Sequence, residues 1–144
     1  MVLSGPTTYL LDTNTVSYIA IDRSPAARRA LNQAMMDHPI AISAITEGEV
    51  LFGLAKNPGA KAARLRASVE LLFPTLRILP WDSAAARAYG ALRAQLFAAG
   101  KPLSVMDTLI AAHAIAADAV LVTHDQAFRQ VKSLRCVDWA TDLS

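Results

Sequence analysis

The sequence has almost no cysteine, few aromatic residues and no long apolar run. Cys136 is its one cysteine, so the chain cannot form an internal disulfide, and we expect a buried, unreactive thiol. No apolar run approaches the roughly 20 residues that a membrane-spanning helix needs. The first residues, MVLSGPTTYLLDTN, lack the basic start and long apolar core of a signal peptide. These absences exclude a disulfide scaffold and favour a cytoplasmic protein with no membrane segment.

Charge is almost balanced, at a net +2 from 14 Lys and Arg against 12 Asp and Glu. Hydrophobic residues make up 53% of the 144 and charged residues 18%, so we expect residues 1–144 to fold as a single globular domain. Two basic clusters would suit a phosphate backbone, although solvated helix faces explain each of them equally well. The clusters are Arg23, Arg28 and Arg29, and Lys56, Lys61, Arg64 and Arg66.

Short apolar runs alternate with stretches of helical periodicity along the chain. This alternation predicts a three-layer α/β/α fold, in which helices cover both faces of a central parallel sheet of about five strands. The expected strands are 8–12, 39–43, 76–79, 119–123 and 135–138. The expected helices are 14–20, 25–36, 45–56, 60–72, 83–99 and 105–117, with a short helix before the last strand.

Four acidic residues lie near helix starts at the carboxyl edge of the expected sheet, where such folds bind ligands. They are Asp12, Glu49, Asp107 and Asp125. A structural explanation exists for each, because helix N-termini attract carboxylates. Thr46 with Glu49, and Ser104 with Asp107, even have the spacing of a capping box. Taken singly, each acid is explained better by capping than by chemistry.

Taken together, the four acids indicate a metal site. Asp12 ends one expected strand and Asp125 follows another, so their carboxylates face each other if those strands are neighbours. Two unit charges about 4 Å apart repel by about 4 kcal/mol at an effective dielectric of about 20, so four carboxylates would not converge without a cation. Oxygen ligands without a Cys or His cluster suit Mg²⁺ or Mn²⁺, which activate water and hold phosphate oxygens. The acids therefore predict phosphodiester or phosphoryl chemistry.

The three histidines offer no competing site. His113 lies about 120° around its helix from Asp107, so the two side chains point apart. His38 and His124 are expected in loops, with His124 facing solvent. The sequence also lacks a Gly-rich phosphate loop and a GxSxG nucleophile motif.

The segments LLDTN, SAITEGEVLFG, SVMDTLIAAHAIA and LVTHDQAF resemble, in order and spacing, the four acidic motifs of PIN-domain nucleases. The group they resemble most is the VapC-type toxins of bacterial toxin–antitoxin pairs. This resemblance implies a PIN-like fold and a Mg²⁺- or Mn²⁺-dependent endoribonuclease. It also implies a homodimer and a small antitoxin partner. Hydrolysis by a metal-activated water needs no 2′-hydroxyl nucleophile, so we expect RNA products with 5′-phosphate and 3′-hydroxyl ends.

Carried over to this chain, the motif acids are Asp12, Glu49, Asp107 and Asp125, with Asn14 where a polar residue often supports the site. Glu47 lies about 200° around the helix from Glu49, so only one of them can face the site. Helical periodicity favours Glu47, whereas the motif E-(hydrophobic)-x-x-G selects Glu49. We take Glu49 as the site residue.

Two alternatives remain open. The segment from Asp12 to Val16 resembles the D-x-D-x-[TV] motif of haloacid-dehalogenase-like phosphatases, although Asn14 replaces their second acid. The second alternative is a PIN-like scaffold that binds RNA or protein without cutting, against which the retention of all four acids argues.

Overall fold

A five-stranded parallel sheet forms the middle of the protein, seen in a computed structural model that describes residues 6–144. The strands are β1 (Tyr9–Leu11), β2 (Ile40–Ser43), β3 (Arg77–Leu79), β4 (Val120–Val122) and β5 (Cys136–Val137). They lie in the order β3-β2-β1-β4-β5, and each neighbouring pair is parallel. All five expected strands are confirmed, each slightly shorter than expected. Residues 1–5, where the sequence shows no signal-peptide pattern, lie outside the described residues.

Six α-helices connect the strands of the described chain. They are α1 (Thr13–Ala20), α2 (Pro25–Ala34), α3 (Ala44–Lys56), α4 (Ala60–Leu72), α5 (Ser83–Ala99) and α6 (Val105–Ala116). Short 3-10 helices follow α4 and β4, namely η1 (Phe73–Thr75) and η2 (Gln126–Gln130). Ser24 caps α2, accepting a hydrogen bond from Ala27 N at 3.0 Å, with Pro25 in the first turn. Gly100 ends α5 in the left-handed region, at φ 64°, as its position after the apolar pattern predicts.

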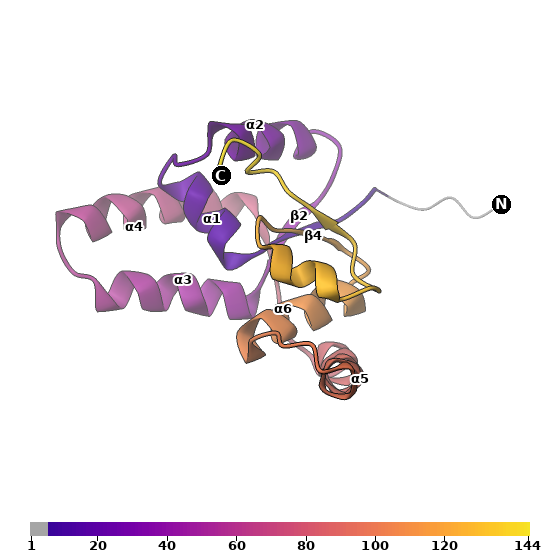
Figure 1. Ribbon diagram of the computed structural model, residues 1–144. Helices are drawn as coiled ribbons and strands as arrows, with labels where there is room; N and C mark the ends of the chain where they lie inside the picture. The colour runs from indigo at the N-terminus through magenta and orange to yellow at the C-terminus, as the bar shows by residue number, and fades with distance from the viewer. Residues whose placement is uncertain (1–5) are drawn as a thin grey trace.

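Side chains alternate between the two faces of the sheet and divide the core in two. Leu11, Ile42 and Val122 pack with α1 to α4, while Leu10 and Leu121 pack with α5, α6 and η2. Figure 1 shows α5 and α6 on one side of the sheet and α1 and α2 on the other. The three-layer α/β/α architecture is therefore confirmed.

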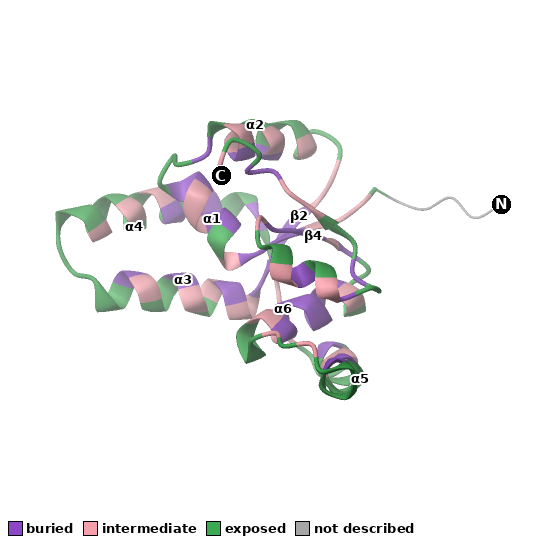
Figure 2. Cartoon of the chain, in the orientation of Figure 1, coloured by how far each residue is buried: buried purple, intermediate pink, exposed green. Residues whose placement is uncertain are grey.

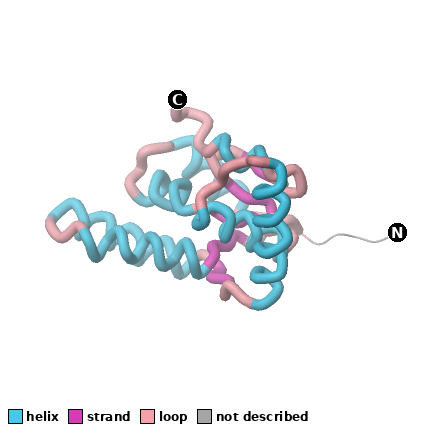
Figure 3. Tube along the Cα trace, turned by 60° about the horizontal axis from the view of Figure 1, so that its bottom comes forward, coloured by secondary structure: helices cyan, strands magenta, loops and turns pink. Residues whose placement is uncertain are grey.

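Helices α3 and α4 form a hairpin that projects beyond the sheet (Figures 1 and 3). The outer part of the hairpin is exposed (Figure 2). Apolar side chains are also exposed elsewhere along the two helices, with Phe52 in the middle of α3 65% exposed and Leu71 near the end of α4 79% exposed. Within residues 6–144, no helix combines the length and the apolar character that crossing a bilayer would require.

The chain after β5 runs back across the molecule and contacts two earlier elements. Trp139 packs against Tyr9 at 5.3 Å between ring centroids, and Asp142 accepts hydrogen bonds from Ser24 Oγ and Ala26 N at the start of α2. The prediction of a buried Cys136 is wrong, because its side chain is exposed. It lies on β5, an edge strand of two residues, so the helices do not cover it as they cover the central strands.

Candidate active site

Strands β1 and β4 are neighbours, and their carboxyl ends bring Asp12 and Thr123 together. Leu11 pairs with Val122, and Asp12 N donates to Val122 O at 3.0 Å. The Asp12 carboxylate, 5% exposed, accepts a hydrogen bond of 2.8 Å from Thr15 N, and the Thr123 hydroxyl lies near enough to lower its pKa. The bond from Thr15 makes Asp12 the N-cap of α1. Asp12 therefore combines a capping role with a buried position at the sheet edge.

The Asp12 carboxylate is held in an environment that disfavours its charge. Burial raises the pKa of Asp12, and the nearby Asp107 carboxylate raises it further, while hydrogen bonds from Thr123 and Thr15 act in the opposite direction. The polar contacts of Asp12 with Thr15 and Thr123 thus only partly offset desolvation and like-charge repulsion. A carboxylate whose charged form is disfavoured in this way is a candidate for a functional residue.

Asp107 lies in the first turn of α6, opposite Asp12. Ser104 caps this helix by accepting from Asp107 N at 3.1 Å, as the capping-box spacing predicts. Burial raises the pKa of Asp107, the bond with the Ser104 side chain lowers it, and the Asp125 carboxylate raises it. Asp107 therefore interacts electrostatically with both Asp12 and Asp125.

Glu49 reaches the same region from the second turn of α3. Its Oε1 accepts a hydrogen bond of 2.7 Å from the hydroxyl of Thr13, the residue that follows Asp12. Glu47 instead lines a groove between α3 and α4, together with Leu51 and Leu54. Helical periodicity was misleading here because α3 projects beyond the sheet and presents a second apolar face to α4.

The predicted capping box at the start of α3 is wrong. The helix begins at Ala44, and its N-cap is Ser43, which accepts a hydrogen bond from Ile45 N at 3.1 Å. Thr46 therefore lies within the first turn and is fully buried. Helix capping therefore does not explain why an acid stands at position 49.

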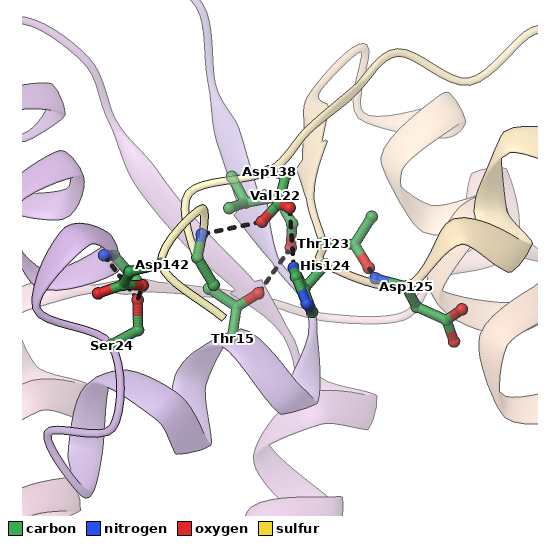
Figure 4. Close-up of polar contacts among 10 residues, drawn as sticks. Thr15, Ser24, Val122, Thr123, His124, Asp125, Asp138 and Asp142 are labelled. Carbon is green, nitrogen blue, oxygen red and sulfur yellow. Dashed lines mark hydrogen bonds and ion pairs between the residues drawn. The ribbon is translucent and has the colours of Figure 1, made fainter. Parts of the chain in front are cut away.

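Asp125 is the most exposed of the four acids. It caps η2, accepting from Ala127 N at 2.9 Å, and its own N–H donates to Thr123 Oγ1 at 3.0 Å. Figure 4 shows its side chain pointing away from the His124–Asp138 pair. The Thr123 hydroxyl therefore contacts both Asp12 and the backbone of Asp125, which fixes the relative position of these two acids.

The four acids surround one region without converging on a single point. Asp107 lies within electrostatic reach of Asp12 and of Asp125, and Glu49 is linked to the Asp12 segment through Thr13. Across residues 6–144, however, no three His, Cys, Asp or Glu side chains are close enough together to hold a metal ion. The expected close convergence is therefore not observed within the described residues.

Several supporting contacts were missed from the sequence. Thr13 and Thr123 bridge the acids, although only Asn14 was expected to support the site; Asn14 is exposed, and its side chain makes no hydrogen bond within the described chain. The available sign was a threonine within one or two residues of each acid that follows a strand, Thr13 after Asp12 and Thr123 before Asp125. His124 was expected to face solvent, but it is half-buried and pairs with Asp138 at 2.8 Å (Figure 4).

The raised pKa of Asp12 predicts a pH-dependent stability without added metal. The folded chain binds this proton more tightly than the unfolded chain does, so the free energy of unfolding falls as pH rises through the raised pKa. Asn caps a helix as well as Asp does. In EDTA at neutral pH, Asp12→Asn should therefore melt at a higher temperature than the wild type. The difference should shrink towards about pH 4, the ordinary range of a carboxyl group. Thermal melts across this pH range measure it, and a wild type that gains on the variant as pH rises would contradict the prediction.

Known proteins resemble this chain over nearly its whole length. The PIN domain family matches residues 9–134. The tRNA(fMet)-specific endonuclease VapC of Shigella flexneri is 33% identical over 136 residues, which cover 92% of this chain and 98% of that protein. The VapC ribonuclease Y4jK of Sinorhizobium fredii is 37% identical over 121 residues, covering 81% of this chain and 86% of that protein.

Solved structures agree with the sequence relatives. The crystal structure of VapBC2 from Rickettsia felis bound to a promoter DNA fragment contains a chain with a TM-score of 0.86 and 28% identity, covering 92% of this chain and 99% of that one. The DNA-bound VapBC of Salmonella typhimurium gives a TM-score of 0.82 at 30% identity, covering 92% and 98%. This chain therefore belongs to the PIN-domain family. Within that family its likeness is to the VapC proteins of VapBC toxin–antitoxin complexes.

Proposed function

We propose that this chain is a Mg²⁺- or Mn²⁺-dependent endoribonuclease and the toxin of a type II toxin–antitoxin pair. It acts as a single nuclease domain spanning residues 1–144, in the cytoplasm. The observation that carries the proposal is the buried Asp12 carboxylate at the carboxyl edge of the sheet, within electrostatic reach of Asp107, with the pKa of each acid raised chiefly by burial. Capping alone does not require two carboxylates in one region whose charged forms are both disfavoured.

The donor set fits a hard divalent cation. The candidate ligands are carboxylate oxygens, and none of the sulfur or imidazole ligands that select zinc or copper is needed. Asp12 and Asp107 would hold the cation, with Glu49 and Asp125 completing its surroundings. A bound Mg²⁺ or Mn²⁺ supplies positive charge for phosphate oxygens and lowers the pKa of a water nucleophile. A bound cation would offset the burial and the neighbouring carboxylate charges that raise the pKa of Asp12 and of Asp107.

The remaining contacts orient these acids. Thr13 fixes Glu49 through a 2.7 Å hydrogen bond, and Thr123 fixes Asp12 together with the backbone of Asp125. Asp12 is buried and anchored to α1, so it can keep its position while RNA enters and leaves. Asp125 is exposed at the rim, where it can meet the incoming backbone.

The proposed partners are an RNA substrate, a small antitoxin and a second copy of the chain. The relatives are named as ribonucleases, and the structural neighbours are toxin–antitoxin complexes. Apolar side chains that remain exposed in the single chain give such partners a surface to cover. Among them are Met36, Phe52, Leu71 and Phe97, exposed by 75%, 65%, 79% and 89%.

A cleavage assay with matched substrates tests the proposal. The purified chain should cut single-stranded RNA when Mg²⁺ or Mn²⁺ is added, and should not cut it in EDTA. Turnover of a small phosphate monoester without RNA cleavage would support a phosphatase instead, although the exposed Asn14 lacks the acid that such enzymes use. RNA binding without cutting under every metal condition would support a scaffold.

A further inference from the structure

A small polar cavity adjoins the acidic residues, between β4, η2 and β5. It has a volume of about 170 Å³, and its walls include Thr123, Asp125, Arg129, Cys136 and Asp138. Two of these residues connect it to the candidate active site, because Thr123 bonds Asp12 and Asp125 belongs to the acid set. A cavity of this size is smaller than the roughly 300–1,000 Å³ of a typical small-molecule site, so it suits part of one nucleotide.

Arg129 is the only cationic side chain on the cavity wall. Within residues 6–144 it makes no ion pair, whereas the other arginine beside β5, Arg135, is paired with Asp118 at 2.9 Å. Two acids also line the cavity: Asp138 is bonded to His124 and to Ala140 N, and Asp125 caps η2 by accepting from Ala127 N and makes no ion pair with Arg129 in the described chain. The guanidinium of Arg129 is therefore left for a ligand, and phosphate is the group that it binds in a planar, bidentate manner.

Electrostatic effects on Cys136 support this arrangement. Desolvation raises the pKa of the Cys136 thiol, the Arg129 charge lowers it, and the Asp12 charge raises it. The Cys136 sulfur therefore lies within electrostatic reach of both Arg129 and Asp12. Phosphate bound at Arg129 would thus lie beside the acids that are proposed to cut RNA.

We propose that this cavity receives the phosphate end of the nucleotide next to the cleaved phosphodiester, with Arg129 contacting that phosphate. The inference rests on the proposed function and adds a subsite to it. A cation there holds the RNA backbone in register with Asp12 and Asp107, while the acids themselves would repel it. Arg129 is thus a substrate-binding residue, separate from the metal ligands.

The test combines a binding measurement with chemical protection of the single cysteine. A short fluorescent single-stranded RNA is titrated against the Asp107→Asn chain, so that binding is measured without cutting. Adding Arg129→Gln should weaken binding by about tenfold, the value of one charged hydrogen bond. It should also reduce the slope of log K against log salt by about 0.7, as expected for one phosphate contact on a single strand. Arg129→Lys should restore the salt slope.

Arg135→Gln is the matched control, because it removes the same charge at the opposite end of the sheet. It should leave the affinity within about twofold, since an exposed ion pair contributes little. In a parallel measurement, RNA should slow the reaction of Cys136 with N-ethylmaleimide, and should slow it less in the Arg129→Gln chain.

The outcomes separate the subsite from the proposed function. If the wild type cuts RNA but the two arginine variants bind alike and RNA leaves Cys136 fully reactive, the subsite is wrong and the nuclease proposal stands. If the wild type neither cuts nor binds RNA with Mg²⁺ or Mn²⁺ present, both fail. Selective weakening by Arg129→Gln together with protection of Cys136 supports the subsite.

Discussion

Substitution of Asp107 by Asn is expected to lower RNA cleavage by at least about 100-fold while leaving the fold intact. Groups that merely orient a metal ligand are worth about 10–100-fold, so removing the charge of a ligand should cost at least as much. The helix cap should survive, because Ser104 bonds the backbone N–H of residue 107, which the substitution retains. Initial cleavage rates and melting curves of the two proteins measure both effects.

A matched control keeps this result specific. Asp118→Asn changes the same side chain beyond the end of α6, at an exposed position with φ 51°, a conformation that Asn also tolerates. It should cut like the wild type. Normal cutting by Asp107→Asn would remove Asp107 from the site, and a loss of folding would instead favour the purely structural role of a capping residue.

The second large effect is stabilisation by metal. At 100 times its dissociation constant, a ligand that binds only the folded state stabilises it by about 2.7 kcal/mol. For a domain of this size that corresponds to a rise of roughly 5–10 °C in melting temperature. The wild type should show this rise with Mg²⁺ or Mn²⁺, and Asp12→Asn should lose most of it. The reason is that Asp12 would supply a charged carboxylate ligand, which the variant lacks.

Asp37→Asn provides the comparison for this experiment. Asp37 is exposed between α2 and β2, before the amino end of β2 and so at the opposite edge of the parallel sheet from the acids, and the substitution should leave the metal response unchanged. An equal rise in all three proteins would show that metal binds elsewhere. If only Asp12→Asn loses the rise, this experiment and the pH experiment in EDTA would together show that the Asp12 carboxylate destabilises the metal-free chain and binds the metal.

Much of the fold could be predicted because local pattern and tertiary packing agree. The apolar runs around Leu10, Ile42 and Leu121 are buried on both faces, which only the central strands of a covered parallel sheet require. Capping residues such as Ser24 and Asp82 stand where the helical periodicity begins, and in the structure they cap α2 and α5. The edge was less predictable: Cys136 alternates like a buried residue, but β5 has a neighbour on one side only.

The sequence predicts that the acids lie at one edge of the sheet, but it does not predict the contacts that hold them. Parallel strands end at the same edge, so Asp12 and Asp125 follow directly from the strand assignment. The hydroxyl bridges through Thr13 and Thr123 depend on side-chain distances across different elements, which spacing in one chain does not encode. The same holds for Glu47 and Glu49, since the choice depends on how far α3 projects beyond the sheet.

The ends of the cleaved RNA test the central claim most directly. Hydrolysis by water, assisted by a cation that the acids hold, should leave 5′-phosphate and 3′-hydroxyl ends, and cutting should stop in EDTA. Single-stranded RNA cut by the wild-type chain is analysed for both ends, with the Asp107→Asn chain as the blank. Our account predicts 5′-phosphates in Mg²⁺ or Mn²⁺ only. A 2′,3′-cyclic phosphate, or activity that survives in EDTA, would contradict it.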